Sequence, residues 1–440
     1  MENISILILL FILIYTFIKV YKSITTLKFG LFEYALCWFA FIYTLIPIFI
    51  IYSNDYISDH YKHLIVPGNT YILETILIFI SFVCFIIGGN SLNDTKWFII
   101  TKEINYKKFY RIAIFLFVLS SFFWLIYANL YGGIDYVLNN ISKIRSGSDD
   151  NKNYLGAFFL MLAKFIIIAF LMVVFLKLKG FFKEKKNIYH LPFFLIIIMT
   201  FANAITSGGR TNIILLLVYV LLSIYFIKKS IPLAQIGLYF TLILFVVFYG
   251  KTFIFLAFGD NNMDFDHIHN IQKSRGFLNI FIQEFNHPFL SLSNFVNNEY
   301  DFRYFKDYFI WALKPMKLLQ PSETFYDSIS YYNTYLIIGK WQSDIPPGFI
   351  AMAYMNGGII GIVLQSLLFG RIFKWFALLI KNSNLSNNGL VFVFYLILFQ
   401  CVMTMFSGGD IALLIQGYIP YIIIFFILCI SKTILFLKRN

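Results

Sequence analysis

The chain has 440 residues, of which 60% are hydrophobic and 13% are charged, and its formal net charge is +13. Soluble domains carry about 25% charged residues, so this composition excludes an ordinary soluble domain. Most lysine and arginine lies in short segments between apolar runs. That distribution favours anionic lipid headgroups over nucleic acid as the partner of the positive charge.

Apolar runs recur along the whole chain and predict membrane-spanning helices. Each run approaches the roughly 20 residues that a helix needs to cross a hydrocarbon core about 30 Å thick. A β-barrel would need short segments of alternating polarity instead. The first run lacks a basic n-region and is interpreted as a span, not a signal peptide. We predict an all-α polytopic membrane protein with eleven spans, at residues 3–20, 30–52, 70–88, 109–131, 154–176, 190–206, 212–227, 233–257, 347–369, 388–406 and 413–431.

The connections between these spans alternate in charge. Lysine and arginine fill every second connection, beginning with Lys22 and Lys28, and they also close the chain at Lys438 and Arg439. The intervening connections are mixed or acidic. Because cytoplasmic loops carry the excess of basic residues, the alternation predicts an N-terminus outside the membrane and a C-terminus inside.

One outside connection, residues 258–346, is much longer than the others. It contains aromatic-rich stretches and a helix-like apolar run from Gly276 to Phe285. Loops this long are usually functional. The predicted organisation is therefore helices 1–8 in residues 1–257, this extracytoplasmic loop with short interfacial helices, and helices 9–11 with a cytoplasmic tail in residues 347–440.

A short polar segment, Thr206-Ser207-Gly208-Gly209-Arg210-Thr211-Asn212, separates the sixth and seventh spans. Its glycines allow a tight turn and a close approach of the backbone to a ligand. Thr211 and Asn212 suit the first turn of the next helix, where anions are favoured. A guanidinium stays charged and binds phosphate through two parallel hydrogen bonds. Arg210 is therefore the leading candidate for a catalytic residue; the alternative is an arginine that anchors a helix end.

Three further arginines lie in outside connections: Arg145, Arg275 and Arg303. Each is a candidate for binding an anionic substrate, or else a solvated surface residue. In the ninth span, Tyr354 and Asn356 are the polar side chains able to reach a headgroup or a sugar.

The long loop also supplies candidates for a general base. Asp264, Asp266 and His267 lie close together in the sequence, and carboxylates and imidazoles can accept a hydroxyl proton. Their spacing is compatible with a metal ion, but a polar loop accounts for it better, so we predict no metal site. Two more carboxylates, Glu33 and Glu74, lie within or near the second and third spans. Ionisable groups there are either functional or placed near helix ends.

Four features together resemble the oligosaccharide repeat-unit polymerases, the Wzy or O-antigen polymerase family. These features are a glycine pair followed by Arg145-Ser146, Ser207-Gly208-Gly209-Arg210-Thr211 at the head of a helix, a large outside loop before the last three spans, and Pro346-Pro347-Gly348 followed by Tyr354-Met355-Asn356-Gly357-Gly358. The chain departs from relatives at Ser407-Gly408-Gly409-Asp410, where they can carry an arginine near the Gly-Asp pair.

The resemblance implies a reaction at the outer leaflet of the bacterial cytoplasmic membrane. A growing glycan would pass from undecaprenyl pyrophosphate to the non-reducing sugar of a new lipid-linked repeat, in O-antigen or capsule-type synthesis. No cofactor is implied. The partners implied are the lipid-linked glycan, membrane lipids, and a chain-length regulator and a flippase of the same pathway. Arg210 and Arg145 would bind pyrophosphate, and Arg275 pyrophosphate or glycan.

Two other classes of protein share parts of this pattern. A glycosyltransferase that uses a polyprenyl-monophosphate sugar tends to carry acidic residues in its first outside loop, as Asp55 and Asp59 do here. A flippase for the lipid-linked glycan would line a membrane-deep path with charges, for which only Glu33, Glu74 and Lys164 qualify.

Overall fold

The computed structural model describes residues 2–26, 28–57, 59–64, 70–92, 97–101, 105–141, 144, 154–183, 189–208, 210–229, 232–258, 276–298, 300–313, 327–341, 345–381, 388–431 and 434–438. Among these residues, eight helices are long and apolar enough to cross a membrane. Three further helices contain shorter apolar stretches, at His190–Thr206, Asn212–Lys228 and Ala234–Gly250. The predicted class, a helical membrane protein, is confirmed.

The chain folds into two compact units that each combine segments far apart in the sequence. Unit 1 comprises Met1–Lys96, Arg275–Leu379 and Leu398–Gln416, and unit 2 comprises Trp97–Ser274, Ile380–Ile397 and Gly417–Asn440. Each unit therefore contains residues from more than one of the three consecutive segments predicted from the sequence, which were residues 1–257, 258–346 and 347–440.

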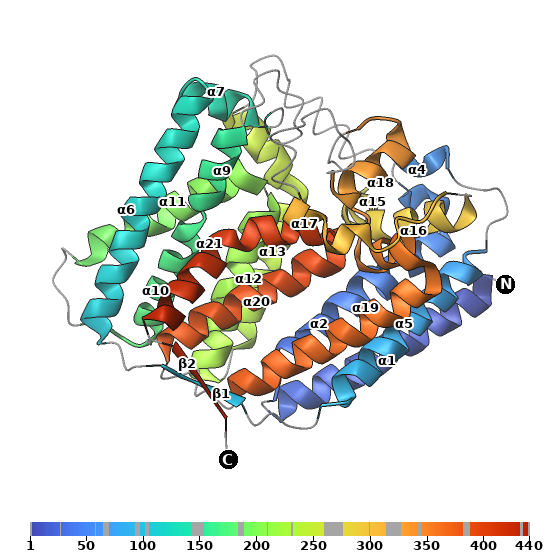
Figure 1. Ribbon diagram of the computed structural model, residues 1–440, viewed down its shortest axis with the longest axis horizontal. Helices are drawn as coiled ribbons and strands as arrows, with labels where there is room; N and C mark the ends of the chain where they lie inside the picture. Colours follow the sequence, from blue (N-terminus) through green and yellow to red (C-terminus); the bar gives the residue numbers. More distant parts are fainter. Residues whose placement is uncertain are drawn as a thin grey trace. The chain divides into compact units, whose positions relative to one another are not determined.

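Long apolar helices run side by side through unit 1 (Figure 1). They are α1 (Glu2–Thr25), α5 (Ile72–Asn90), most of α19 (Phe349–Lys381) and a span made of α2 (Leu31–Ala40), η1 (Phe41–Leu45) and α3 (Ile46–Tyr52). The wider π-helical turn η1 runs up to Pro47. Proline lacks an N–H and clashes with the carbonyl four residues earlier in a regular helix, and a π turn relieves both effects.

Helices α5 and α19 approach closely because small residues line their contact. A methyl group added at Gly88 would lie 2.2 Å from the Leu367 carbonyl oxygen, and one at Gly370 would lie 2.2 Å from the Phe85 carbonyl oxygen. The hydroxyls of Ser81 and Ser366 are 2.8 Å apart across the same contact. Small residues and hydroxyl pairs are common means of helix association within membranes.

Short helices gather at the end of unit 1 where α1 begins (Figure 1). They are η2 (Asn54–Tyr56), α4 (Asp59–Lys62), α15 (Phe277–Phe285), α16 (His287–Asn297), η4 (Lys306–Tyr308), α17 (Ile310–Leu313) and α18 (Ile329–Ile338). The helix expected from Gly276 to Phe285 is present as α15, and Gly276 stands before it with a positive φ of 72°.

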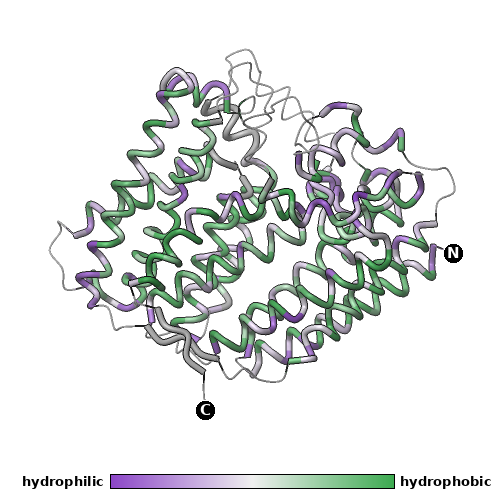
Figure 2. The backbone as a smooth tube through the Cα atoms, in the orientation of Figure 1, coloured by the Kyte–Doolittle hydropathy of each residue, from purple (hydrophilic) through white to green (hydrophobic). Residues whose placement is uncertain are grey.

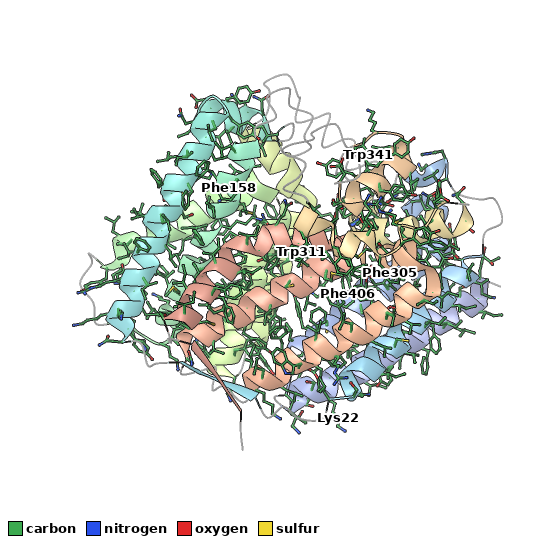
Figure 3. All side chains as sticks on the ribbon, viewed as in Figure 1. Lys22, Phe158, Phe305, Trp311, Trp341 and Phe406 are labelled. Atoms are coloured by element: carbon green, nitrogen blue, oxygen red, sulfur yellow. The ribbon has the colours of Figure 1, made fainter. Side chains whose placement is uncertain are left out.

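One end of unit 1 is rich in lysine. At the end away from the short helices, the ammonium groups of Lys19 and Lys374 lie 5.1 and 5.4 Å from the centre of the Phe32 ring. Figure 2 shows polar residues at both ends of these helices and apolar residues between them. Figure 3 shows Lys22 at the lysine-rich end and Trp341 among the short helices at the other.

Unit 2 holds most of the remaining helices. They are α6 (Tyr106–Leu130), α7 (Ile134–Asn139), α9 (Tyr154–Leu162), α10 (Phe165–Leu178), α11 (His190–Gly208), α12 (Arg210–Lys228) and α13 (Leu233–Phe258). Helices α20 (Gly389–Gly408) and α21 (Ile411–Ile430) contribute residues to both units.

A pair of short strands departs from the predicted all-α fold. β1 (Trp97–Thr101) pairs antiparallel with β2 (Ile434–Lys438), so that Trp97 lies opposite Lys438 and Thr101 opposite Ile434. β1 belongs to the third connection and β2 to the C-terminal tail, both of which the sequence analysis left without regular structure. The β-branched and aromatic residues of both segments favour this pairing.

Candidate functional site

Arg210 is the first residue of helix α12 in unit 2. Helix α11 ends at Gly208, and the two helices pack against each other, so Arg210 stands at the tip of a helical hairpin. The N–H groups of the first turn of a helix have no partner within that helix, and they favour an anion. The predicted helix start at this segment is confirmed, while the Arg210 side chain lies outside the described part of the structure.

The hairpin tip is at the end of unit 2 opposite the starts of α6 and α11. The Tyr110 hydroxyl donates to the Tyr189 carbonyl at 2.8 Å, which joins the start of α6 to the start of α11. The Trp124 indole donates to Thr206 Oγ1 at 3.2 Å, which joins the far half of α6 to the end of α11. Six lysines lie near the first of these contacts, in the first turn of α6 and at the ends of α10 and α12: Lys107, Lys108, Lys177, Lys179, Lys228 and Lys229.

The ninth predicted span contains a break in unit 1. Within α19, Gly357 (φ −160°, ψ 24°) and Gly358 (φ 57°, ψ −143°) leave the helical conformation. Gly358 has a backbone that residues with a Cβ rarely adopt. At Gly357 space is the constraint, because an added methyl group would lie 2.6 Å from the Phe305 ring. Non-helical backbone at such a place is tolerated where protein or a water-filled cavity surrounds it.

The connection from Arg303 to Asp307 covers this break. The backbone N–H of Arg303 donates to the Met355 carbonyl at 2.8 Å, and that of Phe305 donates to the Asn356 carbonyl at 3.1 Å. These bonds satisfy carbonyls at the end of the first helical half, which the break leaves without an intrahelical partner. To make these bonds, Tyr304 and Phe305 adopt positive φ values of 47° and 60°. This backbone conformation is strained for residues with large side chains.

The Arg303 side chain holds this connection in place. Its Nε and Nη2 donate to the two Asp307 carboxylate oxygens at 2.6 and 2.7 Å, and its plane covers the Tyr332 ring at 4.6 Å. The Arg303 side chain is 10% exposed and that of Asp307 1%. Arg303, predicted either to bind substrate or to be a solvated surface residue, is thus mostly buried and engaged with a protein carboxylate.

Asn356 and Tyr354 are also engaged within unit 1. Asn356 is fully buried; its amide donates to the Met352 carbonyl at 2.9 Å and its Oδ1 accepts from the Asp307 N–H at 3.3 Å. The Tyr354 ring lies 6.0 Å from the rings of both Phe295 and Phe302. The structure therefore brings Arg303 and Asn356 into one network at the break, with Tyr354 on the neighbouring turn of α19.

Two buried carboxylates, Glu74 and Asp410, connect the short helices to the membrane helices through hydrogen bonds. Glu74 Oε1, in the first turn of α5, accepts from Ser293 Oγ at 2.7 Å and from Asn297 Nδ2 at 2.9 Å. Asp410 Oδ2 accepts from Ser330 Oγ at 2.6 Å, and its Oδ1 caps α21 by accepting from the Leu413 N–H at 3.0 Å. Asp410 thus has a structural role in the Ser407–Asp410 turn, as an N-cap.

A partly buried histidine joins the start of α16 to the end of α20. His287 Nε2 donates to the Ser407 carbonyl at 3.1 Å. Burial lowers the pKa of His287 to about 4, against opposing contributions from the Ser407 carbonyl and from Glu284. The imidazole is therefore neutral at physiological pH and serves as a hydrogen-bond donor.

The His287 contact predicts a specific acid sensitivity. Because the pKa of His287 is about 4 in the folded protein and that of a free imidazole side chain is 6.5, the unfolded chain takes up the proton first as the pH falls. The stabilisation is complete above about pH 6.5 and is lost toward pH 4. We expect the apparent melting temperature of the detergent-solubilised protein to fall over this range, and to fall less in His287→Gln, which cannot be protonated. Equal slopes for the two proteins would contradict this role.

The remaining candidates lie outside the described residues. They are Arg145 and Arg275, predicted to bind substrate, and Asp264, Asp266 and His267, predicted as candidates for the general base. Comparison of the chain with family models, curated proteins and solved structures found no match in any of the three.

Proposed function

We propose that this protein is a membrane glycosyltransferase that polymerises lipid-linked oligosaccharide repeat units. It would transfer a growing glycan from undecaprenyl pyrophosphate onto a new lipid-linked repeat at the outer leaflet of a bacterial cytoplasmic membrane, for an O-antigen or capsule-type polysaccharide. The observation that carries the proposal is the position of Arg210, which is the first residue of helix α12 and lies at the end of unit 2 opposite the starts of α6 and α11.

The chemistry of the leaving group explains why this position matters. As the bond between the sugar and the pyrophosphate breaks, negative charge grows on the phosphate oxygen. A helix N-terminus and a guanidinium placed there in advance stabilise that charge without reorganisation. Arg210 and Arg145 are assigned to the pyrophosphate, and Arg275 to the pyrophosphate or the glycan. The acceptor hydroxyl needs a base, assigned to Asp264, Asp266 or His267.

The proposal includes the orientation with the N-terminus outside and eleven spans. Two observations support it. Six lysines of unit 2, in the first turn of α6 and at the ends of α10 and α12, lie at the end away from Arg210, as expected if that end faces the cytoplasm. The pairing of β1 with β2 also joins the third connection to the C-terminal tail, two segments that the charge alternation assigns to the same side.

Reporter fusions test this orientation. Fusions at Asn153, Asn212 and Asn298 should give an outside readout, and fusions at Lys185 and Lys438 an inside readout, because the basic connections stay in the cytoplasm. A cytoplasmic readout at Asn298 would show that the large loop lies inside the cell, and it would contradict the proposed reaction at the outer leaflet.

The alternative of a flippase is less well supported. Its charges should line a path deep in the membrane, yet of the three candidates Glu33 and Glu74 lie in the first turns of α2 and α5, and only Lys164 lies well inside a span. The Glu33 carboxylate accepts from the Gly30 N–H at 3.0 Å and so caps its own helix. The second alternative, a transferase that uses a polyprenyl-monophosphate sugar, differs in its donor and is separated by offering each donor to the purified protein.

The glycan phenotype of a deletion strain tests the proposed function. Cells without the protein should lose long polysaccharide chains and retain a single repeat unit on the surface. A flippase deletion would instead leave the single-repeat lipid inside the cell. Unchanged chain lengths in the deletion strain would refute the proposal.

A further inference from the structure

Unit 1 contains an open cavity of about 680 Å³, which lies apart from the break in α19. It is lined by His63, Tyr300, Tyr335 and the end of α18, through Gly339. The volume is typical of a small-molecule site. We infer that this cavity binds the uncharged sugar rings of a glycan, a role that rests on the proposed function and assigns a separate subsite to the part of the substrate that carries no phosphate.

One side chain that lines the cavity, Tyr335, has a ring that neighbouring residues hold in place. Tyr335 is 49% exposed, and its ring packs on Trp341 with the ring centres 5.4 Å apart. Trp341 is itself fixed, because its indole N–H donates to the buried Asp327 carboxylate at 2.6 Å. A ring that is already immobilised loses little conformational freedom when a ligand covers it. One face of a sugar ring consists of C–H groups, and aromatic rings bury such faces.

The end of α18 adds hydrogen-bond acceptors. The Gly339 N–H donates to the Tyr335 carbonyl at 2.9 Å. Gly339 has a positive φ of 70°, and the helix ends there. The carbonyls of Leu336, Ile337 and Ile338 follow in the last turn, where the helix no longer supplies amide partners. These groups carry the partial negative charge of a helix C-terminus. They suit hydroxyl donors and disfavour an anion such as pyrophosphate.

The side chains around the cavity agree with an uncharged ligand. Among the seven residues that line it, none is Lys, Arg, Asp or Glu. His63 and the two tyrosines provide polar groups that can both donate and accept. The Tyr300 ring is supported from behind by Phe295, with the ring centres 5.6 Å apart. Phosphate sites are typically built from basic side chains or from the N–H groups of a helix N-terminus, whereas this cavity has a helix C-terminus.

Binding to the full-length protein in detergent tests the inference. The probe is the oligosaccharide released by mild acid from the lipid-linked pool of the cells that express the protein, titrated calorimetrically. Tyr335→Ala and Tyr300→Ala should each weaken binding about tenfold, as expected for an aromatic side chain at the centre of a contact. Tyr335→Phe keeps the ring and should retain most of the affinity. Tyr52→Ala removes another exposed tyrosine of unit 1, 81% exposed and outside the cavity, and should bind as the natural protein does.

The possible outcomes separate this inference from the proposed function. Wild-type affinity in both alanine variants, no binding of the oligosaccharide to the natural protein, or competition by inorganic pyrophosphate would each overturn the sugar subsite. Wild-type melting temperatures in the variants establish that a loss of binding is local. Unchanged chain lengths in the deletion strain would refute polymerisation, whereas the titration would still show whether the cavity binds sugar.

Discussion

Replacing Arg210 by alanine should abolish long glycan chains while the protein still inserts and accumulates in the membrane. Removal of one well-placed donor to a developing negative charge costs roughly 10²–10³ in rate. In the processive synthesis of a long polymer, a loss of that size leaves short products. The helix itself should persist, because Arg210 is its first residue and helix ends tolerate substitution better than helix interiors.

The lysine variant separates the two roles considered for Arg210. A lysine ammonium cannot form the planar pair of hydrogen bonds that a guanidinium makes to phosphate, so Arg210→Lys should restore chain length only in part. An arginine that merely anchors a helix end would tolerate lysine, since both side chains extend to the membrane surface. The measurement is polysaccharide chain length on a gel beside the protein level in membranes. Natural chain lengths from the lysine variant would show that Arg210 is an anchor.

Replacing Arg303 by alanine should destabilise unit 1 strongly. The Asp307 side chain is 1% exposed and binds the Arg303 guanidinium through two oxygens. Loss of one partner from a buried ion pair leaves an uncompensated charge and typically costs about 3–5 kcal/mol. The connection that covers Gly357 and Gly358 would lose its anchor. We expect a large fall in the apparent melting temperature of the solubilised protein and a lower level in membranes.

A double variant provides the control for this prediction. Arg303→Gln combined with Asp307→Asn removes both charges and keeps polar groups of similar size at both positions. It should recover much of the stability lost in Arg303→Ala, because no buried charge is left without a partner. If Arg303→Ala melts as the natural protein does, the ion pair contributes little and the Arg303 guanidinium is available for another role, such as substrate binding.

The helical membrane fold was predictable because it depends on local composition. The apolar runs 3–20, 70–88 and 109–131 appear as the helices α1, α5 and α6. The helix start close to Arg210 was also predictable, because Thr211 and Asn212 follow two glycines; the predicted span began at residue 212, and α12 begins at Arg210. Such features depend on a few neighbouring residues and on the thickness of a bilayer.

The break in α19 and its cover were not predictable in the same way. The sequence shows Gly357 and Gly358 inside an apolar run, a pattern that also fits close helix packing. Only the fold brings Phe305 against Gly357 and the Arg303 N–H to the Met355 carbonyl. The pairing of β1 with β2 likewise joins segments more than 300 residues apart. Contacts of this kind depend on tertiary packing, which one sequence does not reveal.

The cavity proposed to bind sugar could not be predicted from the sequence either, because it depends on which side chains the fold brings together. His63, Tyr300 and Tyr335 come from three separate segments of unit 1, and none of them forms a motif with its sequence neighbours. A tyrosine in an aromatic-rich chain is unremarkable by itself. What distinguishes Tyr335 is its support by Trp341 and its position at the end of α18.

Polymerisation by the purified protein is the direct test of the proposed reaction. The full-length protein is placed in lipid vesicles with undecaprenyl-pyrophosphate-linked single repeats, and chain length and released undecaprenyl pyrophosphate are measured together. We expect longer chains, one undecaprenyl pyrophosphate released for each new glycosidic bond, and loss of both products in Arg210→Ala. Chains that fail to lengthen with this donor, or that lengthen only when a polyprenyl-monophosphate sugar is added, would contradict the proposed reaction.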